Sequence, residues 1–332
     1  MRVAVVGSGA WGTALAVHLT KNGHDTALWF RSEQKAALAA QTRLNPALQG
    51  IELPQQLHLT ADAACVIGCE IVVIACPSFP IREVCKKIAP YVERNAVIVS
   101  VTKGIEPETL LRMSEVVEQE LHRTVVALTG PSHAEEVALG VPTGCLAACK
   151  NREAAELVQE VFMSDFFRIY TSPDVVGAEL GGALKNVIAL CAGVCDGMGC
   201  GDNTKAMLMT RGLTEMARLG LSLGASRETF AGLAGVGDLI VTCTSLHSRN
   251  RRAGILIGQG CPVQQAMEQV GAVVEGYYAA KSAWELCRRQ GVEMPILQAA
   301  YSVLYESVSA RDAIMQLLQR GKRAESENAG WE

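Results

Sequence analysis

A lysine in an otherwise apolar stretch is the first residue of this sequence that suggests chemistry. Residues 175 to 195 are almost all apolar or small, and one helical turn from Lys185 stand glycine, alanine and isoleucine. Burial would strip the ammonium of water and lower its pKa from about 10.4, so that proton transfer becomes accessible near neutral pH. Lys185 is therefore predicted to be a general acid. The alternative is a structural lysine whose ammonium reaches solvent.

A second polar cluster lies further along the chain, between residues 232 and 252. Its glycines allow the backbone to approach a ligand closely, and Asp238 is suited to orient an ammonium group. Arg249 and Asn250, in the run Ser-Arg-Asn-Arg-Arg, are candidates for binding a phosphate. A basic loop on a solvated surface is the competing interpretation. Glu275 stands alone and indicates little by itself.

The N-terminal turn Gly-Ser-Gly-Ala-Trp-Gly has the spacing of a dinucleotide site. Gly7, Gly9 and Gly12 lie between an apolar strand and a predicted helix at residues 13–22, which is the context that makes this spacing informative. Missing side chains allow a tight turn and a close approach to the pyrophosphate, whose charge the helix N-terminus favours. Ala10 and Trp11, within the turn, are assigned to the same site. The alternative is a glycine-rich turn that binds nothing.

The residue after the second strand bears on the choice of cofactor. NAD sites usually have Asp or Glu there, whereas this strand ends in Arg31. A guanidinium binds a 2′-phosphate in a bidentate manner, so NADPH is predicted to be preferred, with NADH possible. An arginine that merely solvates the strand end is the other interpretation.

Three further loops are expected to face the same crevice, because ligands of open α/β sheets gather at the carboxyl ends of the strands. Cys76-Pro-Ser follows one strand, where the proline either stiffens the turn at the crevice or simply ends the strand. Lys103 follows the next and places an ammonium at the mouth, unless it is an ordinary surface lysine. Ser132 and Glu135 have the spacing of a capping box, which predicts a helix whose amides face a ligand, or capping alone.

The elements that position these residues divide the chain in two. Short β-branched runs alternate with helical stretches up to about residue 172, which predicts a Rossmann-like, doubly wound sheet with strands at 2–6, 26–30, 71–75, 96–101, 125–129, 143–148 and 167–170. Long apolar and small-residue stretches follow, which predict an all-α domain. We expect a cofactor domain at 1–172, a helical substrate domain at 173–319 and a polar, mobile tail at 320–332.

Composition excludes several classes of protein. With 30 Lys and Arg against 34 Asp and Glu, the net charge of -4 gives no basic excess for nucleic-acid binding. The twelve cysteines show no zinc spacing, so we expect reduced thiols and no metal. The sequence opens on a strand-like MRVAVVG without a signal peptide, and charged residues interrupt every apolar run before about 20 residues. We therefore expect no membrane span and a cytoplasmic enzyme.

Six segments carry a resemblance to a known family: GSGAWGTALA from Gly7, TKG at Lys103, GPSHAEEV from Gly130, GGALKNVIA from Gly181, AGVGDLIVTCT from Ala234 and SRNRR from Ser248. Together, and in this order, they resemble the NAD(P)-dependent glycerol-3-phosphate dehydrogenases, most closely the soluble bacterial type. The resemblance covers residues 2 to 318. It implies a 6-phosphogluconate-dehydrogenase-like fold, commonly in a homodimer, that reversibly converts dihydroxyacetone phosphate and NAD(P)H to sn-glycerol 3-phosphate, a phospholipid precursor.

The resemblance also implies roles for individual residues. Lys185 is the general acid, Lys103 helps to polarise the substrate, and Asp238 with Thr242 supports Lys185. The substrate contacts it implies, besides Lys103, Asp238 and Thr242, are Gly130, Ser132, Asn186, Ser248, Arg249 and Asn250. The cofactor contacts, besides the glycine turn and Arg31, are Lys103, Ala134, Arg249, Val273 and Glu275. The rivals are a ketopantoate-type reductase and a non-catalytic NADPH-binding module.

Overall fold

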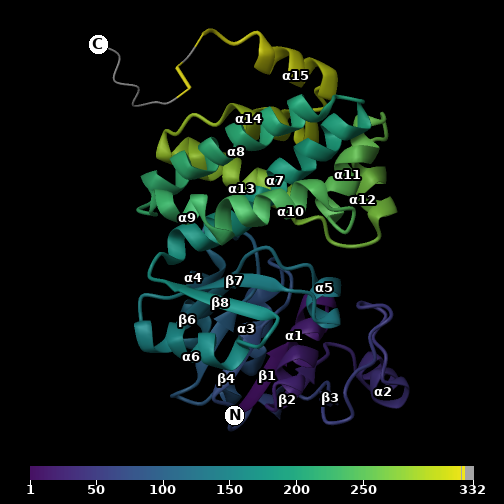
Figure 1. The fold of residues 1–332 in the computed structure, drawn as a ribbon, viewed down its shortest axis with the longest axis vertical. Helices are drawn as coiled ribbons and strands as arrows, with labels where there is room; N and C mark the ends of the chain where they lie inside the picture. Colours follow the sequence, from purple (N-terminus) through teal and green to yellow (C-terminus); the bar gives the residue numbers. More distant parts are fainter. Residues whose placement is uncertain (323, 326–332) are drawn as a thin grey trace.

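The computed structural model describes residues 1–322 and 324–325 (Figure 1). A sheet half carries the N-terminus, and a helical half is stacked upon it. Residues 323 and 326–332 of the predicted polar tail lie outside the described residues.

The sheet half is built on eight strands in the order β3-β2-β1-β4-β5-β6-β7-β8. All neighbouring strands are parallel except β6 and β7, which are antiparallel. The strands are β1 Arg2–Val6, β2 Asp25–Trp29, β3 His58–Thr60, β4 Ile71–Ile74, β5 Val97–Ser100, β6 Val125–Thr129, β7 Thr143–Ala148 and β8 Phe167–Ser172. All seven predicted strands are present. The three-residue β3 was not predicted, because it lacks the buried apolar run that marks the central strands.

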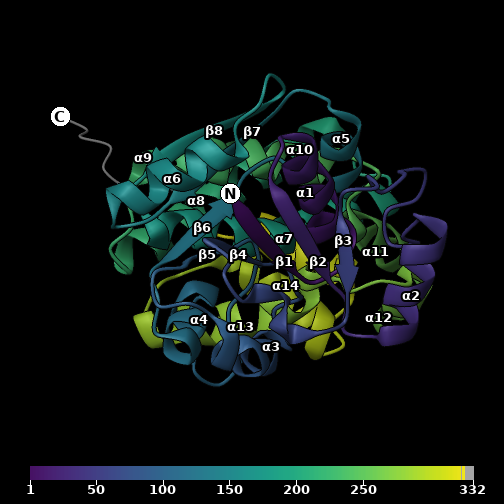
Figure 2. The same ribbon diagram turned by 90° about the horizontal axis from the view of Figure 1, so that it is seen from below.

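Helices cover both faces of this sheet, so each face has its own core. They are α1 Ala10–Lys21, α2 Glu33–Thr42, α3 Ile81–Ile88, α4 Met113–Leu121, α5 Ala134–Leu139 and α6 Arg152–Phe162. On one face Leu15 of α1 and Phe162 of α6 belong to a single apolar cluster, and on the other face Ile81 of α3 and Met113 of α4 do so. This is the Rossmann-like, doubly wound arrangement that the sequence predicts. Figure 2 shows the strands side by side against the helical half.

The helical half surrounds one long central helix, α7 Val175–Gly197. The others are α8 Asp202–Ser222, α9 Arg227–Ala231, α10 Asp238–Thr244, α11 Arg249–Gly258, α12 Val263–Val270, α13 Glu275–Gln290, α14 Pro295–Tyr305 and α15 Ala310–Leu318. Glycines bring α7 and α11 into backbone contact, because a Cβ on Gly254 would lie 2.0 Å from the carbonyl oxygen of Leu190. The two helices are thereby fixed against each other.

Among the described residues, α7 alone has the length and composition of a membrane-crossing helix, and the sequence predicts no membrane span. This helix is long and apolar enough by length and composition, because Glu179 and Lys185 are its only charged residues before its last turn. However, 83% of its apolar window is buried inside the protein, as in the core helix of a globular fold.

Candidate active site

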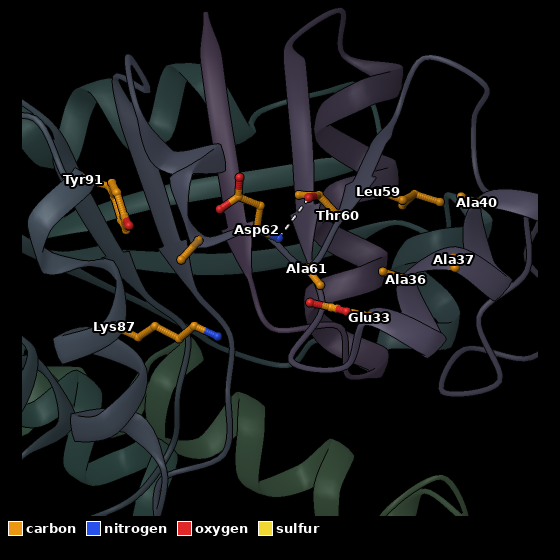
Figure 3. A pocket seen from close by; sticks show the side chains of 11 residues that line it. Glu33, Ala36, Ala37, Ala40, Leu59, Thr60, Ala61, Asp62, Lys87 and Tyr91 are labelled. Atoms are coloured by element: carbon orange, nitrogen blue, oxygen red, sulfur yellow. Dashed lines mark hydrogen bonds between the residues drawn. The ribbon is translucent and has the colours of Figure 1, made fainter.

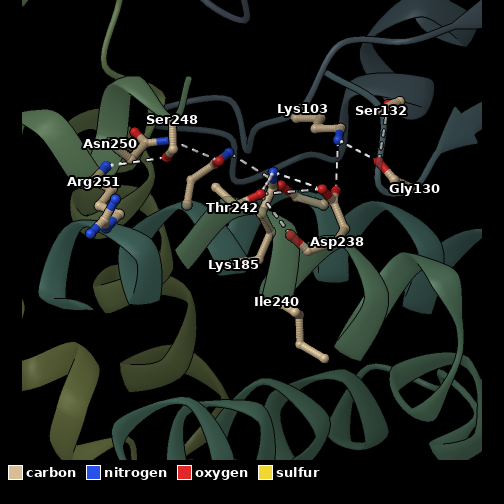
Figure 4. Close-up of polar contacts among 12 residues, drawn as sticks. Lys103, Gly130, Ser132, Lys185, Asp238, Ile240, Thr242, Ser248, Asn250 and Arg251 are labelled. Atoms are coloured by element: carbon tan, nitrogen blue, oxygen red, sulfur yellow. Dashed lines mark hydrogen bonds and ion pairs between the residues drawn. The ribbon is translucent and has the colours of Figure 1, made fainter. Parts of the chain in front are cut away.

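Two lysines, one from each half, meet on a single carboxylate (Figure 4). Lys185 Nζ, on α7, lies 2.9 Å from Asp238 Oδ1, and Lys103 Nζ, after β5, lies 2.6 Å from Asp238 Oδ2. Asp238 is 1% exposed and Lys185 is 6% exposed. Burial of Lys185 is what its apolar surroundings in the sequence predict. The arrangement places two ammonium groups at the junction of the halves.

Burial is the main influence on the proton of Lys185. It lowers the pKa of Lys185 to about 8, with a smaller lowering by Lys103, while Asp238 acts in the opposite direction. Burial acts to raise the pKa of Asp238, but the two neighbouring ammonium groups outweigh it and hold that pKa below its ordinary value. The carboxylate therefore stays ionised beside a lysine that titrates near neutral pH, which suits general acid chemistry.

Thr242 holds Lys185 from the same helix as Asp238. It stands one turn after Asp238 on α10, and Lys185 Nζ donates to Thr242 Oγ1 over 2.6 Å. The Thr242 hydroxyl in turn donates to the backbone oxygen of Asp238 over 2.6 Å. A π-helical turn, Leu233–Gly237, leads into α10, and a Cβ on Gly235 would lie 2.0 Å from the backbone oxygen of Phe230. The glycines of this segment thus allow its backbone to pack closely on Phe230, and this packing fixes where α10 begins.

The loop after β6 contributes a carbonyl rather than a helix cap. Lys103 Nζ donates to the backbone oxygen of Gly130 over 3.3 Å, and Ser132 Oγ donates to the same oxygen over 3.0 Å. The predicted capping box of Ser132 and Glu135 was wrong, because α5 starts one residue later, with His133 at its N-cap. The serine hydroxyl turns back to the loop carbonyl instead.

Two polar atoms beside this cluster were missed by the sequence analysis. Thr129 Oγ1, at the carboxyl end of β6, and His133 Nε2 are buried without a hydrogen-bond partner. Gly182 of α7 lies against Thr129, since a Cβ there would be 2.9 Å from Thr129 Oγ1 and 3.5 Å from Lys103 Cγ. The position of Thr129 at a strand end was a signal that could have identified it.

The glycine turn has the geometry of a preformed dinucleotide site. Gly7 has a φ of +125°, and a Cβ on Gly12 would lie 2.0 Å from the Gly7 carbonyl oxygen. A Cβ on Gly9, by contrast, would meet nothing within 4 Å. Gly9 is the N-cap of α1 and offers no side chain to its amides. The open space above Gly9 and the uncapped amides of α1 fit a pyrophosphate.

A buried asparagine fixes this turn and was also missed. Asn45 Nδ2 donates to the backbone oxygen of Ser8 over 2.9 Å and to Thr13 Oγ1 over 2.8 Å. It therefore joins the loop after α2 to both ends of the turn. It stands outside any recognised spacing, so no sequence signal marked it.

The remaining candidate cofactor residues come from both halves and range from exposed to buried. Arg31 is exposed just beyond β2. Glu275, at the start of α13, accepts from Ser78 Oγ over 2.9 Å, and burial raises its pKa. Val273 is half-buried, and Ala134 is buried at the start of α5. Ser78 thus gives the Cys-Pro-Ser loop a contact between the two halves.

Candidate substrate residues gather at the start of α11. Ser248 is its N-cap and accepts from the backbone N–H of Arg251 over 3.2 Å, whereas Arg249 is exposed. Asn250 is buried, and its amide is engaged within the protein: Nδ2 donates to Asn186 Oδ1 over 2.9 Å. This bond uses one of the two N–H groups on Asn250 Nδ2, so what α11 can offer to a phosphate is Arg249, the second N–H of Asn250 and the first backbone amides.

A separate cavity lies beside β3 and α2 (Figure 3). It measures about 580 Å³ and is lined by Glu33, Thr60, Asp62, Lys87 and Tyr91 among others. Among the described residues that line it, none is a candidate from the sequence. Nor do the described residues contain a cluster of three or more His, Cys, Asp or Glu able to hold a metal ion. All twelve cysteines are thiols, and eight of them are buried.

Fold and site together are those of a dinucleotide-dependent oxidoreductase. Comparison with known proteins gives the family. The family model for the N-terminus of NAD-dependent glycerol-3-phosphate dehydrogenase matches residues 2–155, and the model for its C-terminus matches residues 174–315. The chain belongs to this family of NAD(P)-dependent enzymes.

Individual relatives agree over nearly the whole chain. A glycerol-3-phosphate dehydrogenase (NAD(P)+) of Thermoanaerobacter sp. (strain X514) is 50% identical over 326 residues, which span 98% of this chain and 99% of the relative. The crystal structure of glycerol-3-phosphate dehydrogenase from Coxiella burnetii is 35% identical, with a TM-score of 0.92 over 96% of this chain and 99% of that one.

A ketopantoate reductase of Ralstonia eutropha shares the fold alone. It is 16% identical, with a TM-score of 0.62 over 95% of this chain. The comparisons therefore favour the glycerol-3-phosphate dehydrogenases over the ketopantoate-type rival.

Proposed function

We propose that this chain reduces dihydroxyacetone phosphate to sn-glycerol 3-phosphate, reversibly and with NADPH as its preferred cofactor. The observation that carries the proposal is the buried Lys185, held by Asp238 opposite Lys103 in a chain with a preformed dinucleotide turn. A binding module would need the glycines, but not two lysines on one buried carboxylate.

The side chains of this site divide the work of carbonyl reduction. Bound NADPH supplies the hydride that adds to the carbonyl carbon. Lys185 gives its proton to the carbonyl oxygen, which becomes the new hydroxyl group. Lys103 stabilises charge on that oxygen from the other side, and Asp238 orients both ammonium groups. Thr242, Ser132 and the Gly130 carbonyl complete the polar lining around the substrate.

The phosphate is the part of the substrate that the charges select. Lys185 is buried and Lys103 is mostly buried, so the attraction of each for a phosphate exceeds its value of about 1 kcal/mol at 4 Å in water, and Arg249 adds an exposed cation. Ser248, Arg249 and Asn250, at the N-terminus of α11, add backbone amides that favour an anion. Asn186 lines this region from α7. Three cations favour a phosphorylated ketone over its unphosphorylated analogue.

The cofactor is held by residues of both halves. Gly7, Gly9, Ala10, Trp11 and Gly12 receive the pyrophosphate, and Arg31 the 2′-phosphate that separates NADPH from NADH. Ala134, Val273 and Glu275 contact the cofactor nearer to the reaction centre, beside Lys103 and Arg249. We also propose a division at residues 1–172 and 173–319, a homodimer, a cytoplasmic location, and a role in phospholipid synthesis.

One spectrophotometric assay tests the proposed function. NADPH oxidation is followed with dihydroxyacetone phosphate, dihydroxyacetone or ketopantoate as the substrate, and again with NADH. We expect turnover with dihydroxyacetone phosphate, at least tenfold lower kcat/KM with dihydroxyacetone, and a higher kcat/KM with NADPH than with NADH. If only ketopantoate is turned over, the chain is a ketopantoate-type reductase. Tight NADPH binding without turnover of any ketone would favour the non-catalytic binding module.

A further inference from the structure

A buried glutamate joins the two halves and has no part in the chemistry proposed so far. Glu179, near the start of α7, is 8% exposed. Its Oε1 accepts from the backbone N–H of Ser114 over 2.7 Å, and its Oε2 accepts from Ser114 Oγ and from Arg112 Nη1, each over 2.6 Å. Arg112 is the N-cap of α4, and Ser114 lies in its first turn. We call these three residues the glutamate tie, because they join α4 to α7.

The glutamate tie holds the far end of the loop that begins at Lys103. Lys103 and Arg112 stand at the two ends of this loop, between β5 and α4. Across it, the backbone N–H of Glu106 donates to the backbone oxygen of Leu111 over 2.9 Å. Ile105 and Arg112 pair in an antiparallel bridge beside that bond. The loop is thus closed on itself, so a movement at Arg112 is passed to Lys103.

Helix α7 meets Lys103 itself one turn after Glu179. Gly182 lies three residues further along the same side of the helix, and a Cβ there would lie 3.5 Å from Lys103 Cγ. The next turn carries Lys185, whose Nζ is 2.9 Å from Asp238 Oδ1. Three successive turns of α7 therefore contact the start of α4, the stem of Lys103 and the carboxylate that both lysines share.

We infer that Glu179 is a positioning residue that holds Lys103 in register with Lys185. This inference deepens the proposed function and rests on it, because Glu179 acts on the reaction through Lys103. Without the glutamate tie, the loop end at Arg112 is released from α7. Lys103 is then no longer held against α7 with its ammonium group on Asp238.

The proton of Lys185 reports where Lys103 lies. Lys103 acts to lower the pKa of Lys185, whereas Asp238 and Cys243 of α10 act to raise it. His133, at the N-cap of α5, also faces Lys185, which acts to lower the pKa of His133. Release of Lys103 from Asp238 should therefore raise the pKa of Lys185. The falling limb of the pH profile of kcat should then move to higher pH.

A double-mutant cycle on kcat tests the inference. Glu179→Ala should lower kcat about fivefold or more in the parent chain and move the falling limb to higher pH. In a Lys103→Ala background the same change should lower kcat less than about twofold and leave the limb in place, because the side chain it positions is already absent. If the two effects multiply instead, Glu179 acts independently of Lys103 and the inference is wrong.

The direction of the pH shift excludes a direct effect of the lost charge. A negative charge favours the ammonium form of a lysine, so removal of the Glu179 carboxylate by itself would lower the pKa of Lys185. The falling limb would then move to lower pH. That result, or a limb that stays in place in Glu179→Ala, would contradict the inference.

Acetylation of Lys103 by acetic anhydride, followed by mass spectrometry, tests the glutamate tie without turnover. Lys103 is mostly buried, with Nζ 2.6 Å from Asp238 Oδ2, and it should react about threefold faster or more in Glu179→Ala, because its nitrogen leaves the carboxylate. Lys205 is the matched control, since its Nζ lies 2.6 Å from Asp196 Oδ1 and its side chain is 17% exposed, against 20% for Lys103. The rate at Lys205 should not change.

A second control separates positioning from loss of stability. Glu215 of α8 is also buried, and it accepts from the backbone N–H groups of Ile296 and Leu297 at the start of α14. Glu215→Ala should lower the midpoint of thermal unfolding and leave both kcat and the acetylation of Lys103 within about twofold of the parent. An equal fall of kcat in Glu215→Ala would assign the effect of Glu179→Ala to lost stability.

The acetylation rates also keep this inference separate from the proposed function. If the parent did not turn over dihydroxyacetone phosphate, the proposed function would fail, and the rates alone would decide the glutamate tie. An unchanged rate at Lys103, or an equal rise at Lys205, would reject it. If Glu179→Ala does not fold, Glu179→Gln replaces it. Glutamine conserves size but loses the charge that pairs with Arg112, so every change should have the same direction.

Discussion

The glycine turn and the lysine cluster differ in whether their polar groups already have partners within the protein. At the turn, Gly9 faces open space and the first amides of α1 have no side-chain cap. At the cluster, Lys185 and Lys103 are already bound to Asp238 and are mostly buried. The turn is shaped to receive a ligand, whereas the cluster is shaped to hold charges in place.

This difference separates binding from chemistry. Changes at the turn should alter cofactor affinity and leave proton transfer alone, because no titrating group there is buried with a partner. Changes at the cluster should alter turnover and leave the preformed turn intact, because the two sites are held by different contacts.

The largest expected effect is at Lys185. Lys185→Ala removes the proposed proton donor and should lower kcat by about 10²-fold or more, the scale usual for a lost general acid. Binding of NADPH, followed by fluorescence titration, should stay within a few-fold of the parent. Near-normal turnover would remove Lys185 from this role and end the contrast between the two sites.

A pair of alanine variants sharpens the account of the turn. Gly9→Ala places a methyl group in open space, so the fold should persist while the Kd for NADPH rises about tenfold, equivalent to about 1.4 kcal/mol. Gly12→Ala forces a Cβ onto the Gly7 carbonyl and should destabilise the fold by about 1–3 kcal/mol. Thermal unfolding and NADPH titration measure both. Equal loss of stability in the two variants would contradict the distinction.

A smaller effect is expected at Arg31, because its side chain is exposed. Arg31→Ala should lower the preference for NADPH over NADH about fivefold, since a solvent-exposed ion pair contributes about 1 kcal/mol. The ratio of kcat/KM values for the two cofactors measures it, with Lys35→Ala as a nearby exposed control. An unchanged ratio would place the 2′-phosphate elsewhere.

Most of the fold followed from local patterns. The buried runs of β1, β4 and β6 and the glycine turn were recognisable because each is specified by neighbouring residues. The short β3 was missed, because only its pairing with β2 makes it a strand. The capping box failed for a related reason: the spacing of Ser132 and Glu135 was right, but the Gly130 carbonyl took the hydroxyl.

The sequence predicted which residues belong to the candidate site, but not which hydrogen bonds and ion pairs join them. An isolated lysine among apolar residues is visible in one segment, whereas its partnership with Asp238 spans 53 positions. The placement of Thr129, the contacts of Asn45 and the hydrogen bond between Asn250 and Asn186 depend on segments far apart in the chain, which no spacing records. The assignment of Asn250 to a phosphate came from its basic run and again from the resemblance, whereas the hydrogen bond of its amide to Asn186 could not be seen before the helices were placed.

The pH dependence of kcat tests the central claim most directly. Lys185 must be protonated to donate, so with its pKa lowered to about 8 the rate of ketone reduction should fall as the pH rises through about 8. Asp238 acts to raise that pKa, so in Asp238→Asn the falling limb should move to lower pH. If the falling limb of the pH profile stays in place or moves to higher pH in this variant, Lys185 is not a proton donor whose pKa is lowered by burial and raised by Asp238.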